Sequence, residues 1–157
     1  MGLFAFIKEA GEKLFGSGEA HAAGTDAAAN AKAGEAIKNY IVALNLAPAD
    51  LAVAFDGTNS TVAVSGTAPD QATKEKILLA AGNVAGVSQV SDQMTVAAAA
   101  AEARFHTVAR GDTLSAIAKQ YYGNANKYPV IFEANKPMLS HPDKIYPGQV
   151  LRIPAED

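Results

Sequence analysis

The side chains that most often perform catalysis or bind metals are few in this sequence, and they stand in no catalytic spacing. There is no cysteine, which excludes disulfides, thiol nucleophiles and thiolate metal sites. The three histidines, His21, His106 and His141, are far apart and match no zinc-ligand spacing. The sequence contains no nucleophile elbow, zinc-protease motif or phosphate-binding glycine loop, and the segment 56–59 (DGTN) begins like a calcium loop but lacks its closing glutamate. We therefore expect a binding protein, not an enzyme, without an organic cofactor.

Since these side-chain sites are excluded, the backbone carbonyl oxygens are the remaining groups that could bind an ion. Two glycines mark the places where several such oxygens could lie together. The last four carbonyl groups of a helix have no partner inside the helix, and the helix dipole makes that end negative. Helical patterns break at Gly11, after residues 7–10, and at Gly82, before the segment 83–87. Neutral oxygens suit a large monovalent cation, whereas carboxylates favour divalent ions. Two ordinary helix ends would give the same pattern, so the residues alone leave both interpretations open.

The first half of the chain predicts a small layered unit of helices and strands. Helical spacing predicts an amphipathic helix within residues 1–15, followed by an Ala/Gly-rich connector over 16–34 and a second helix over 37–44. Alternating apolar residues then predict two strands, over 51–55 and 62–64, which a turn at 56–59 joins. A helix after Asp70 and a strand over 90–96 complete the unit. Asp70 is expected to cap its helix, Ile77, Leu78 and Ala81 to face the core, and Gly82 to end the helix.

A second pattern begins after the alanine run Ala97–Ala101, which we take as the centre of a linker over 97–103. Strands over 105–108 and 150–153 enclose helices over 114–121 and 128–134. The fold class is therefore predicted as α+β, with two different units. Alanine forms helices well but offers nothing to anchor them, so the linker is expected to be either a short helix or a hinge.

Composition and patterning also bear on location and partners. The 13 Lys and Arg residues against 16 Asp and Glu residues give a net charge of -3, which disfavours a general nucleic-acid binder. Leu3–Ile7 is too short an apolar run for a secretory signal, and no run approaches the roughly 18 residues of a membrane span. We expect a cytoplasmic monomer without a membrane span.

The second half resembles a LysM domain over 104–154, and the first half is similar to a BON domain over 31–96. The LysM resemblance rests on the segments HTVARGDTLSAIA (106–118), YGN (122–124), IFEAN (131–135) and IYPGQVLRIP (145–154). The BON resemblance rests on the paired strands, Gly57, Gly66, and Gly86-Val87 followed by Val90. These resemblances imply the secondary-structure orders αββαβ for the BON domain and βααβ for the LysM domain.

The order BON then LysM, with MGLF at residues 1–4 and GEKL at 11–14, resembles the bacterial cytoplasmic potassium-binding proteins of that architecture. The match covers essentially the whole chain and departs from the family in the alanine-rich connector. It implies a potassium sensor, also binding rubidium or caesium, that compacts when it binds the ion. The ligands carried over from the family are the backbone carbonyls of Ile7, Ala10, Gly82, Val84, Val87 and Val90.

The LysM resemblance also implies a groove for N-acetylglucosamine polymers, with Asp112, Thr113, Asn135 and Ile145 as the contacting residues. Either Asp112 or Thr113 is additionally expected to cap the helix that follows. This supports a rival hypothesis, an envelope protein that holds peptidoglycan through LysM and lipid through BON. The absence of an export signal favours the potassium hypothesis over this rival, so peptidoglycan is not expected as a partner. A third alternative is an adaptor protein without any small ligand.

Overall fold

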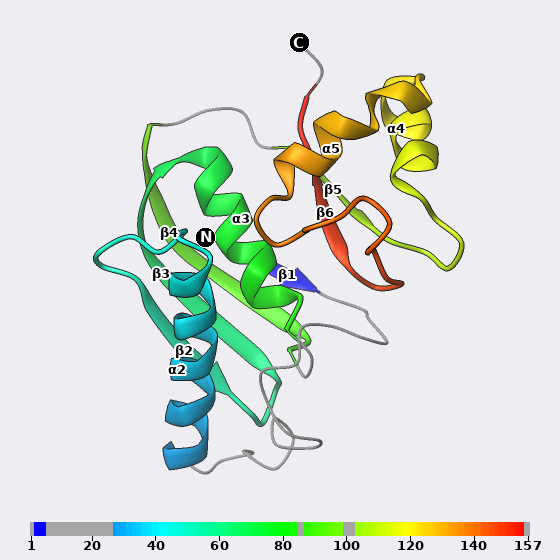
Figure 1. Ribbon diagram of the computed structural model, residues 1–157. Helices are drawn as coiled ribbons and strands as arrows, with labels where there is room; N and C mark the ends of the chain where they lie inside the picture. Colours follow the sequence, from blue (N-terminus) through cyan, green and yellow to red (C-terminus); the bar gives the residue numbers. More distant parts are fainter. Residues whose placement is uncertain (1, 6–26, 85–86, 99–102, 156–157) are drawn as a thin grey trace.

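The computed structural model describes residues 2–5, 27–84, 87–98 and 103–155 (Figure 1). The elements are β1 (Gly2–Ala5), α2 (Ala27–Ala43), β2 (Ala52–Asp56), β3 (Thr61–Asp70), α3 (Gln71–Gly82), β4 (Gln89–Ala98), β5 (Arg104–Thr107), α4 (Leu114–Tyr122), the 3-10 helix η1 (Ala125–Lys127), α5 (Tyr128–Ala134) and β6 (Val150–Ile153). The predicted α+β class is confirmed, and the order from α2 to β4 and from β5 to β6 follows the expected αββαβ and βααβ patterns.

The N-terminal unit is a four-stranded sheet with the strand order β1-β4-β3-β2, and α2 and α3 cover one face of it (Figure 1). β2 and β3 form an antiparallel hairpin through the predicted turn. β3 and β4 run parallel, with Val62 opposite Val90. A parallel pair needs a crossover connection, and α3 supplies it. The loop that follows α3 must therefore return the chain to the start of β4.

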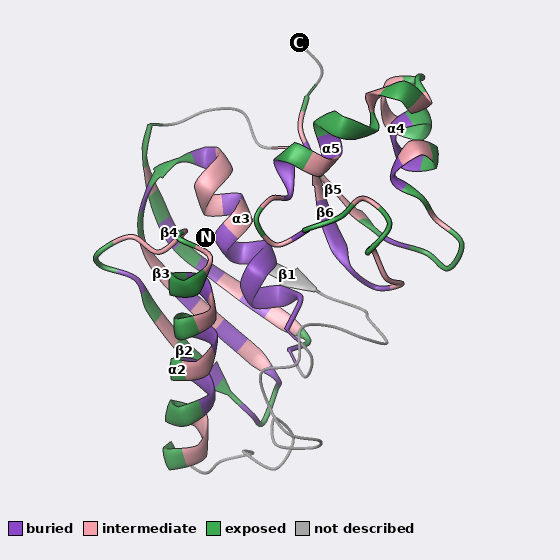
Figure 2. Cartoon of the chain, viewed as in Figure 1, coloured by how far each residue is buried: buried purple, intermediate pink, exposed green. Residues whose placement is uncertain are grey.

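The core of the N-terminal unit lies between the two helices and the sheet (Figure 2). The fully buried side chains from this layer include Ile37, Ile41, Ile77, Val62, Val64 and Val90. The three positions of the α3 helix that were predicted to face the core, Ile77, Leu78 and Ala81, are all buried. Burying such aliphatic side chains contributes roughly 1.5–3 kcal/mol each, so this layer holds the helices on the sheet.

Both predicted ends of α3 are confirmed. Asp70 is the N-cap, and its carboxylate accepts a hydrogen bond of 2.7 Å from the backbone N–H of Thr73. Hydrogen bonds from the Thr73 side chain and backbone hold the pKa of Asp70 below its usual value. Gly82 is the last residue of the helix, and Asn83 is the C-cap.

The start of the chain differs from the expected amphipathic helix. Residues Gly2–Ala5 form β1, which pairs antiparallel with β4 and places Phe4 opposite Val90. Strand pairing satisfies the backbone groups along the edge of β4, which a helix would leave unpaired. The remainder of the expected helix, residues 6–15, lies outside the described residues.

The alanine-rich connector expected over 16–34 ends earlier than predicted, because α2 begins at Ala27. Alanine has the highest helix propensity, so this stretch joins the helix that follows it. Residues 16–26 lie outside the described residues. The expected linker also begins later than predicted, since Ala97 and Ala98 continue β4 and Ala98 lies opposite Asp70. The remaining linker residues 99–102 lie outside the described residues.

The C-terminal unit pairs β5 with β6 in a two-stranded antiparallel sheet, over which α4 and α5 pack. Its own core contains Leu114, Ile117, Ile131, Leu151 and Ile153, all buried. Val150, also on β6, packs instead into the core of the N-terminal unit, against which Phe105 and Met138 lie as well. The two units therefore share one apolar contact region where β6 meets α3.

Gly34 tests how closely α2 lies against β2. A Cβ atom at this position would stand 3.0 Å from the carbonyl oxygen of Val53, tighter than ordinary packing allows. We expect Gly34→Val to lower the free energy of unfolding by about 1–3 kcal/mol, the usual penalty of overpacking. Urea denaturation measures the change, with Ala28→Val, at an exposed position of the same helix that does not line the space against β2, as control. Equal effects of the two substitutions would contradict the close approach.

Candidate functional site

Four of the six residues predicted to offer carbonyl oxygens lie in or beside the loop between α3 and β4: Gly82 ends α3, Val84 and Val87 lie in the loop, and Val90 is the second residue of β4. Gly82, Val84, Val87 and Val90 are all buried, and Val84 and Val90 are completely inaccessible. Residues 85 and 86 lie outside the described residues. A valine side chain has no ligand atom, and these valine side chains belong to the core. The polar chemistry that these residues offer is therefore that of their backbone.

Backbone hydrogen bonds fix the conformation of this loop. The N–H of Asn83 donates to Leu79 O at 2.9 Å, and the N–H of Val87 donates to Val84 O at 3.1 Å. The N–H of Ser88 donates to Ser60 O at 2.8 Å, which fastens the end of the loop to the β2–β3 hairpin. A carbonyl oxygen has two lone pairs, so one that accepts a single hydrogen bond can still face a cation.

The strand β1 arrives at the same end of the sheet. In the antiparallel register with β4, Ala5 lies opposite Gln89, the first residue of β4 after the loop. The other two predicted ligands, Ile7 and Ala10, lie outside the described residues. The last described residue of β1 thus lies beside the end of the loop.

Asn83, which the sequence analysis did not select, links this loop to the C-terminal unit. Its side chain is buried and makes two hydrogen bonds with the backbone of Val150: Nδ2 donates to the carbonyl oxygen at 3.0 Å, and the Val150 N–H donates to Oδ1 at 2.9 Å. The hydroxyl of Tyr146 donates to the carbonyl oxygen of Asn83 at 3.4 Å. The backbone of Asn83 is thus part of the loop, while its side chain and its carbonyl oxygen bond to the C-terminal unit.

A second polar contact joins the units at Glu75, whose residue is 1% exposed. Arg152 Nε lies 2.7 Å from Glu75 Oε1, while Glu75 Oε2 accepts hydrogen bonds from the N–H of Ala103 at 3.0 Å and from Gln71 Nε2 at 3.2 Å. A buried carboxylate is tolerated only when it is paired and hydrogen-bonded in this way.

The contacts of Asn83 and Glu75 with the C-terminal unit form the joint between the two units. The sequence of α3 contained a signal for this joint. Residues 77–82 are buried around the whole circumference of the helix (Figure 2). A helix that is apolar all round is covered on more than one side. The run ILLAAG therefore indicated a second partner for α3, besides the sheet.

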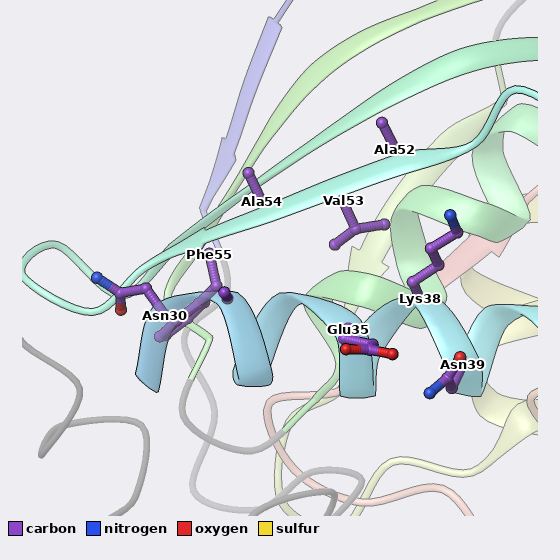
Figure 3. Close-up of a pocket in the computed structure, with 9 residues that line it drawn as sticks. Asn30, Glu35, Lys38, Asn39, Ala52, Val53, Ala54 and Phe55 are labelled. Carbon is purple, nitrogen blue, oxygen red and sulfur yellow. The ribbon is translucent and has the colours of Figure 1, made fainter. Parts of the chain in front are cut away.

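Two hollows of the described surface bear on the location of the site. A small cavity of about 170 Å³ lies at the joint, and its lining residues are Tyr40, Ala80, Asn83, Met138, Leu139, Ser140, Lys144, Tyr146 and Gln149. A larger hollow of about 570 Å³ lies between α2 and β2, where Phe55 points toward the helix (Figure 3). The larger one is separated from β4 by β3, and its walls offer mainly apolar surface with Glu35 and Lys38 at the helix. The residues of the loop therefore do not line the larger of these two hollows.

The four residues expected to contact glycan have structural partners in the C-terminal unit. Asn135 is 2% exposed, and its amide bonds to Ile131 O and to both the N–H and the carbonyl oxygen of Arg152. Ile145 is half-buried against the core. Of the two residues expected to cap α4, Asp112 and Thr113, it is Thr113 that is the N-cap, and its hydroxyl accepts from Ala116 N–H at 3.1 Å.

Asp112 instead accepts a hydrogen bond from the N–H of Ala109, and its carboxylate lies 2.9 Å from His106 Nε2. Burial alone would raise the pKa of Asp112, but the Ala109 hydrogen bond and the contact with His106 outweigh burial and lower it. Asp112 thus organises the turn before α4, a role that its position in the predicted groove did not indicate.

Two further findings concern only the described residues. No group of three or more His, Asp or Glu side chains is placed to hold a metal ion. Among these residues, no helix has both the length and the apolar character needed to cross a membrane.

Comparisons with known proteins agree with the two-unit division. A family model described as "BON domain" matches residues 25–98, and one described as "LysM domain" matches residues 106–154, which confirms the predicted order. The chain is 47% identical over 156 residues to "Potassium binding protein Kbp" of Escherichia coli O6:H1, covering 99% of this chain and 100% of that protein. It is also 50% identical over 50 residues to an uncharacterized protein of Deinococcus radiodurans, covering 32% of this chain and 19% of that protein.

The buried ion pair gives a stability prediction for the joint. Arg152→Met leaves the Glu75 carboxylate buried without its charged partner, and we expect a loss of about 3–5 kcal/mol in the free energy of unfolding. The double variant Glu75→Gln, Arg152→Met should regain most of this loss, because the neutral amide oxygen still accepts from Ala103. Urea denaturation of both variants checks this. Equal stability of the single and double variants would show that Glu75 is not a buried charge in need of Arg152.

Proposed function

This chain belongs to the family of the potassium binding protein Kbp, and we propose that it is itself a potassium-binding protein whose ion is held by backbone carbonyls around the loop between α3 and β4. The observation that carries the proposal is the 47% identity that runs through both domains to a relative named for potassium binding. The proposed ligands are the carbonyl oxygens of Ile7, Ala10, Gly82, Val84, Val87 and Val90.

The chemistry of the loop supports this choice of ion. The valine side chains pack into the core of the BON domain, so the backbone beside them is shielded from water on that side. A shielded ring of carbonyl oxygens can replace the hydration shell of a large monovalent cation. The loop also follows the C-terminal end of α3, where the helix dipole contributes negative potential. The described residues of the loop contribute no carboxylate that would favour a divalent ion.

The reach of the chain supports the two ligands before α2. β1 ends at Ala5 opposite Gln89, and two further residues of extended chain span at most ~7 Å. Ile7 is therefore within reach of the loop that ends at β4. An ion shared by the loop and by residues 7 and 10 would tie the start of the chain to the BON domain.

The proposed consequence is compaction by linkage. An ion that binds only the closed form stabilises that form by RT ln(1 + [L]/Kd), which is about 2.7 kcal/mol at a concentration of 100 Kd. Rubidium and caesium, which are at least as large as potassium, should act in the same way, and sodium much less. We further propose that the protein works as a cytoplasmic monomer, as an ion sensor and not as an enzyme, and that it needs no organic cofactor and does not hold peptidoglycan.

Matched salts test the proposed ion. In potassium, rubidium or caesium chloride we expect a smaller radius of gyration by X-ray scattering and a higher Tm than in sodium chloride of equal concentration, because only the larger ions fit the carbonyl ligands. Calorimetric titration with potassium and sodium chloride should show binding of potassium alone. Identical scattering, melting and titration curves in the two salts would refute the proposal.

A deletion tests the ligands in the segment after β1. Deleting residues 6–12 removes Ile7 and Ala10 but keeps the β1 sequence, so the potassium-dependent rise in Tm should disappear while the Tm in sodium changes little. Circular dichroism in sodium chloride serves as the control for folding. A full potassium response in this variant would exclude Ile7 and Ala10 as ligands and leave the loop to bind the ion by itself.

A further inference from the structure

The strand β6 has one paired edge and one edge that other parts of the chain must close. It pairs with β5 in a two-stranded sheet. The carbonyl oxygen of Gln149, just before the strand, accepts from Val108 N–H at 2.8 Å on the side of β5. Backbone groups alternate in direction along a strand, so the N–H and carbonyl groups of Val150 and Arg152 point to the opposite edge. This edge is buried at Val150 and needs partners for its polar groups.

Two asparagines close that edge in the same manner. Asn135 bonds to Arg152, accepting from its N–H at 2.8 Å and donating to its carbonyl oxygen at 2.9 Å. Asn83 bonds to Val150, accepting from its N–H at 2.9 Å and donating to its carbonyl oxygen at 3.0 Å. Asn135 comes from the LysM domain itself, whereas Asn83 comes from the loop of the BON domain. The LysM domain thus depends on the other domain to complete its own sheet edge.

The position of Asn83 ties this contact to the carbonyls of the loop. The peptide unit between Gly82 and Asn83 carries the Gly82 carbonyl, and the unit between Asn83 and Val84 begins with the Asn83 carbonyl, which accepts from Tyr146. The backbone angles of Asn83, φ -83° and ψ 5°, therefore fix how these two peptide units are turned relative to each other. Because its side chain is held by β6, the LysM domain holds those angles in place.

We infer that Asn83 is the positioning residue through which potassium binding at the loop and docking of the LysM domain are coupled. This inference rests on the proposed function. With the ion bound, the loop keeps the course that presents the Asn83 side chain to Val150. Without the ion, the loop relaxes and the Val150 backbone groups turn to water. Linkage is reciprocal, so docking of the LysM domain raises potassium affinity by the same factor by which potassium favours docking.

The ion pair of Glu75 and Arg152 also joins the two domains, but it does so away from the loop. Glu75 lies eight residues before Asn83, a distance of about 12 Å along α3 at 1.5 Å per residue. It strengthens docking but touches neither Gly82 nor Val84. Glu75→Gln therefore offers a way to loosen docking without altering the loop.

The first experiment compares two amides of β6 by hydrogen exchange. In the full-length protein, potassium should slow exchange of the Val150 amide relative to the Arg152 amide, compared with sodium, because Val150 is held by the loop and Arg152 by Asn135. In Asn83→Ala this potassium-dependent difference should vanish. An unchanged ratio of the two exchange rates in wild-type protein, under conditions where calorimetry shows potassium binding, would overturn the inference.

The second experiment is a double-mutant cycle read by potassium calorimetry. Asn83→Ala should weaken potassium binding at least about fivefold, the lower end of usual coupling between sites. Glu75→Gln should weaken binding in the wild-type background and leave it unchanged in the Asn83→Ala background. Equal effects of Glu75→Gln in both backgrounds, or no effect of Asn83→Ala, would show that coupling does not run through Asn83.

Thr113→Ala is the matched control for general loss of stability. It removes the side-chain cap of α4 within the LysM domain and should leave potassium affinity unchanged. If Thr113→Ala weakened potassium binding as much as Asn83→Ala does, the role of Asn83 would be merely structural. Absence of potassium binding by the wild-type protein would instead refute the proposed function, so the two failures are distinguishable.

Discussion

The buried outer edge of β6 is the constraint on which the arrangement of this molecule depends. Two-stranded sheets are marginal by themselves, and unpaired backbone groups cannot be buried without cost. The LysM domain supplies one partner, Asn135, and the BON domain supplies the other, Asn83. The side chain of Val150 follows the same logic, since it lies in the core of the N-terminal unit and not in that of its own domain. The helix α3 is consequently buried on the sheet side and on the LysM side.

The parts of the fold that the sequence predicted are those decided by nearby residues. Asp70 caps α3 through a hydrogen bond only three residues ahead, and the hairpin turn at 56–59 is equally local. The prediction that Ile77, Leu78 and Ala81 face the core likewise used only the 3.6-residue repeat of a helix. Asn83 and Glu75 gain their roles from Val150 and Arg152, which lie 67 and 77 residues away. No local pattern distinguishes such residues from an ordinary helix cap or a solvent-exposed glutamate.

The error at the N-terminus has a related cause. A short apolar run such as Leu3–Ile7 fits both a helix and a strand, and its conformation is decided by the partner it meets. The partner is the free edge of β4, whose other edge is already paired with β3. Candidate carbonyl ligands are subject to the same limitation, because a carbonyl is present at every residue. Their selection depended on a family resemblance, and the structure adds only that four of them are buried residues in or beside the loop after α3.

The loop after α3 is where the two domains and the proposed ion meet, and each of the three contacts a different set of atoms in the loop. Its valine side chains pack into the BON core, the side-chain amide of Asn83 bonds to the LysM domain, and its backbone carbonyls are the ligands that we propose for the cation. A change in any one of these three contacts must be accommodated by the same few backbone dihedrals. Close-packed protein segments shift between discrete arrangements and do not deform gradually. A short loop held by both domains is therefore a suitable place for the proposed ion to influence the position of a whole domain.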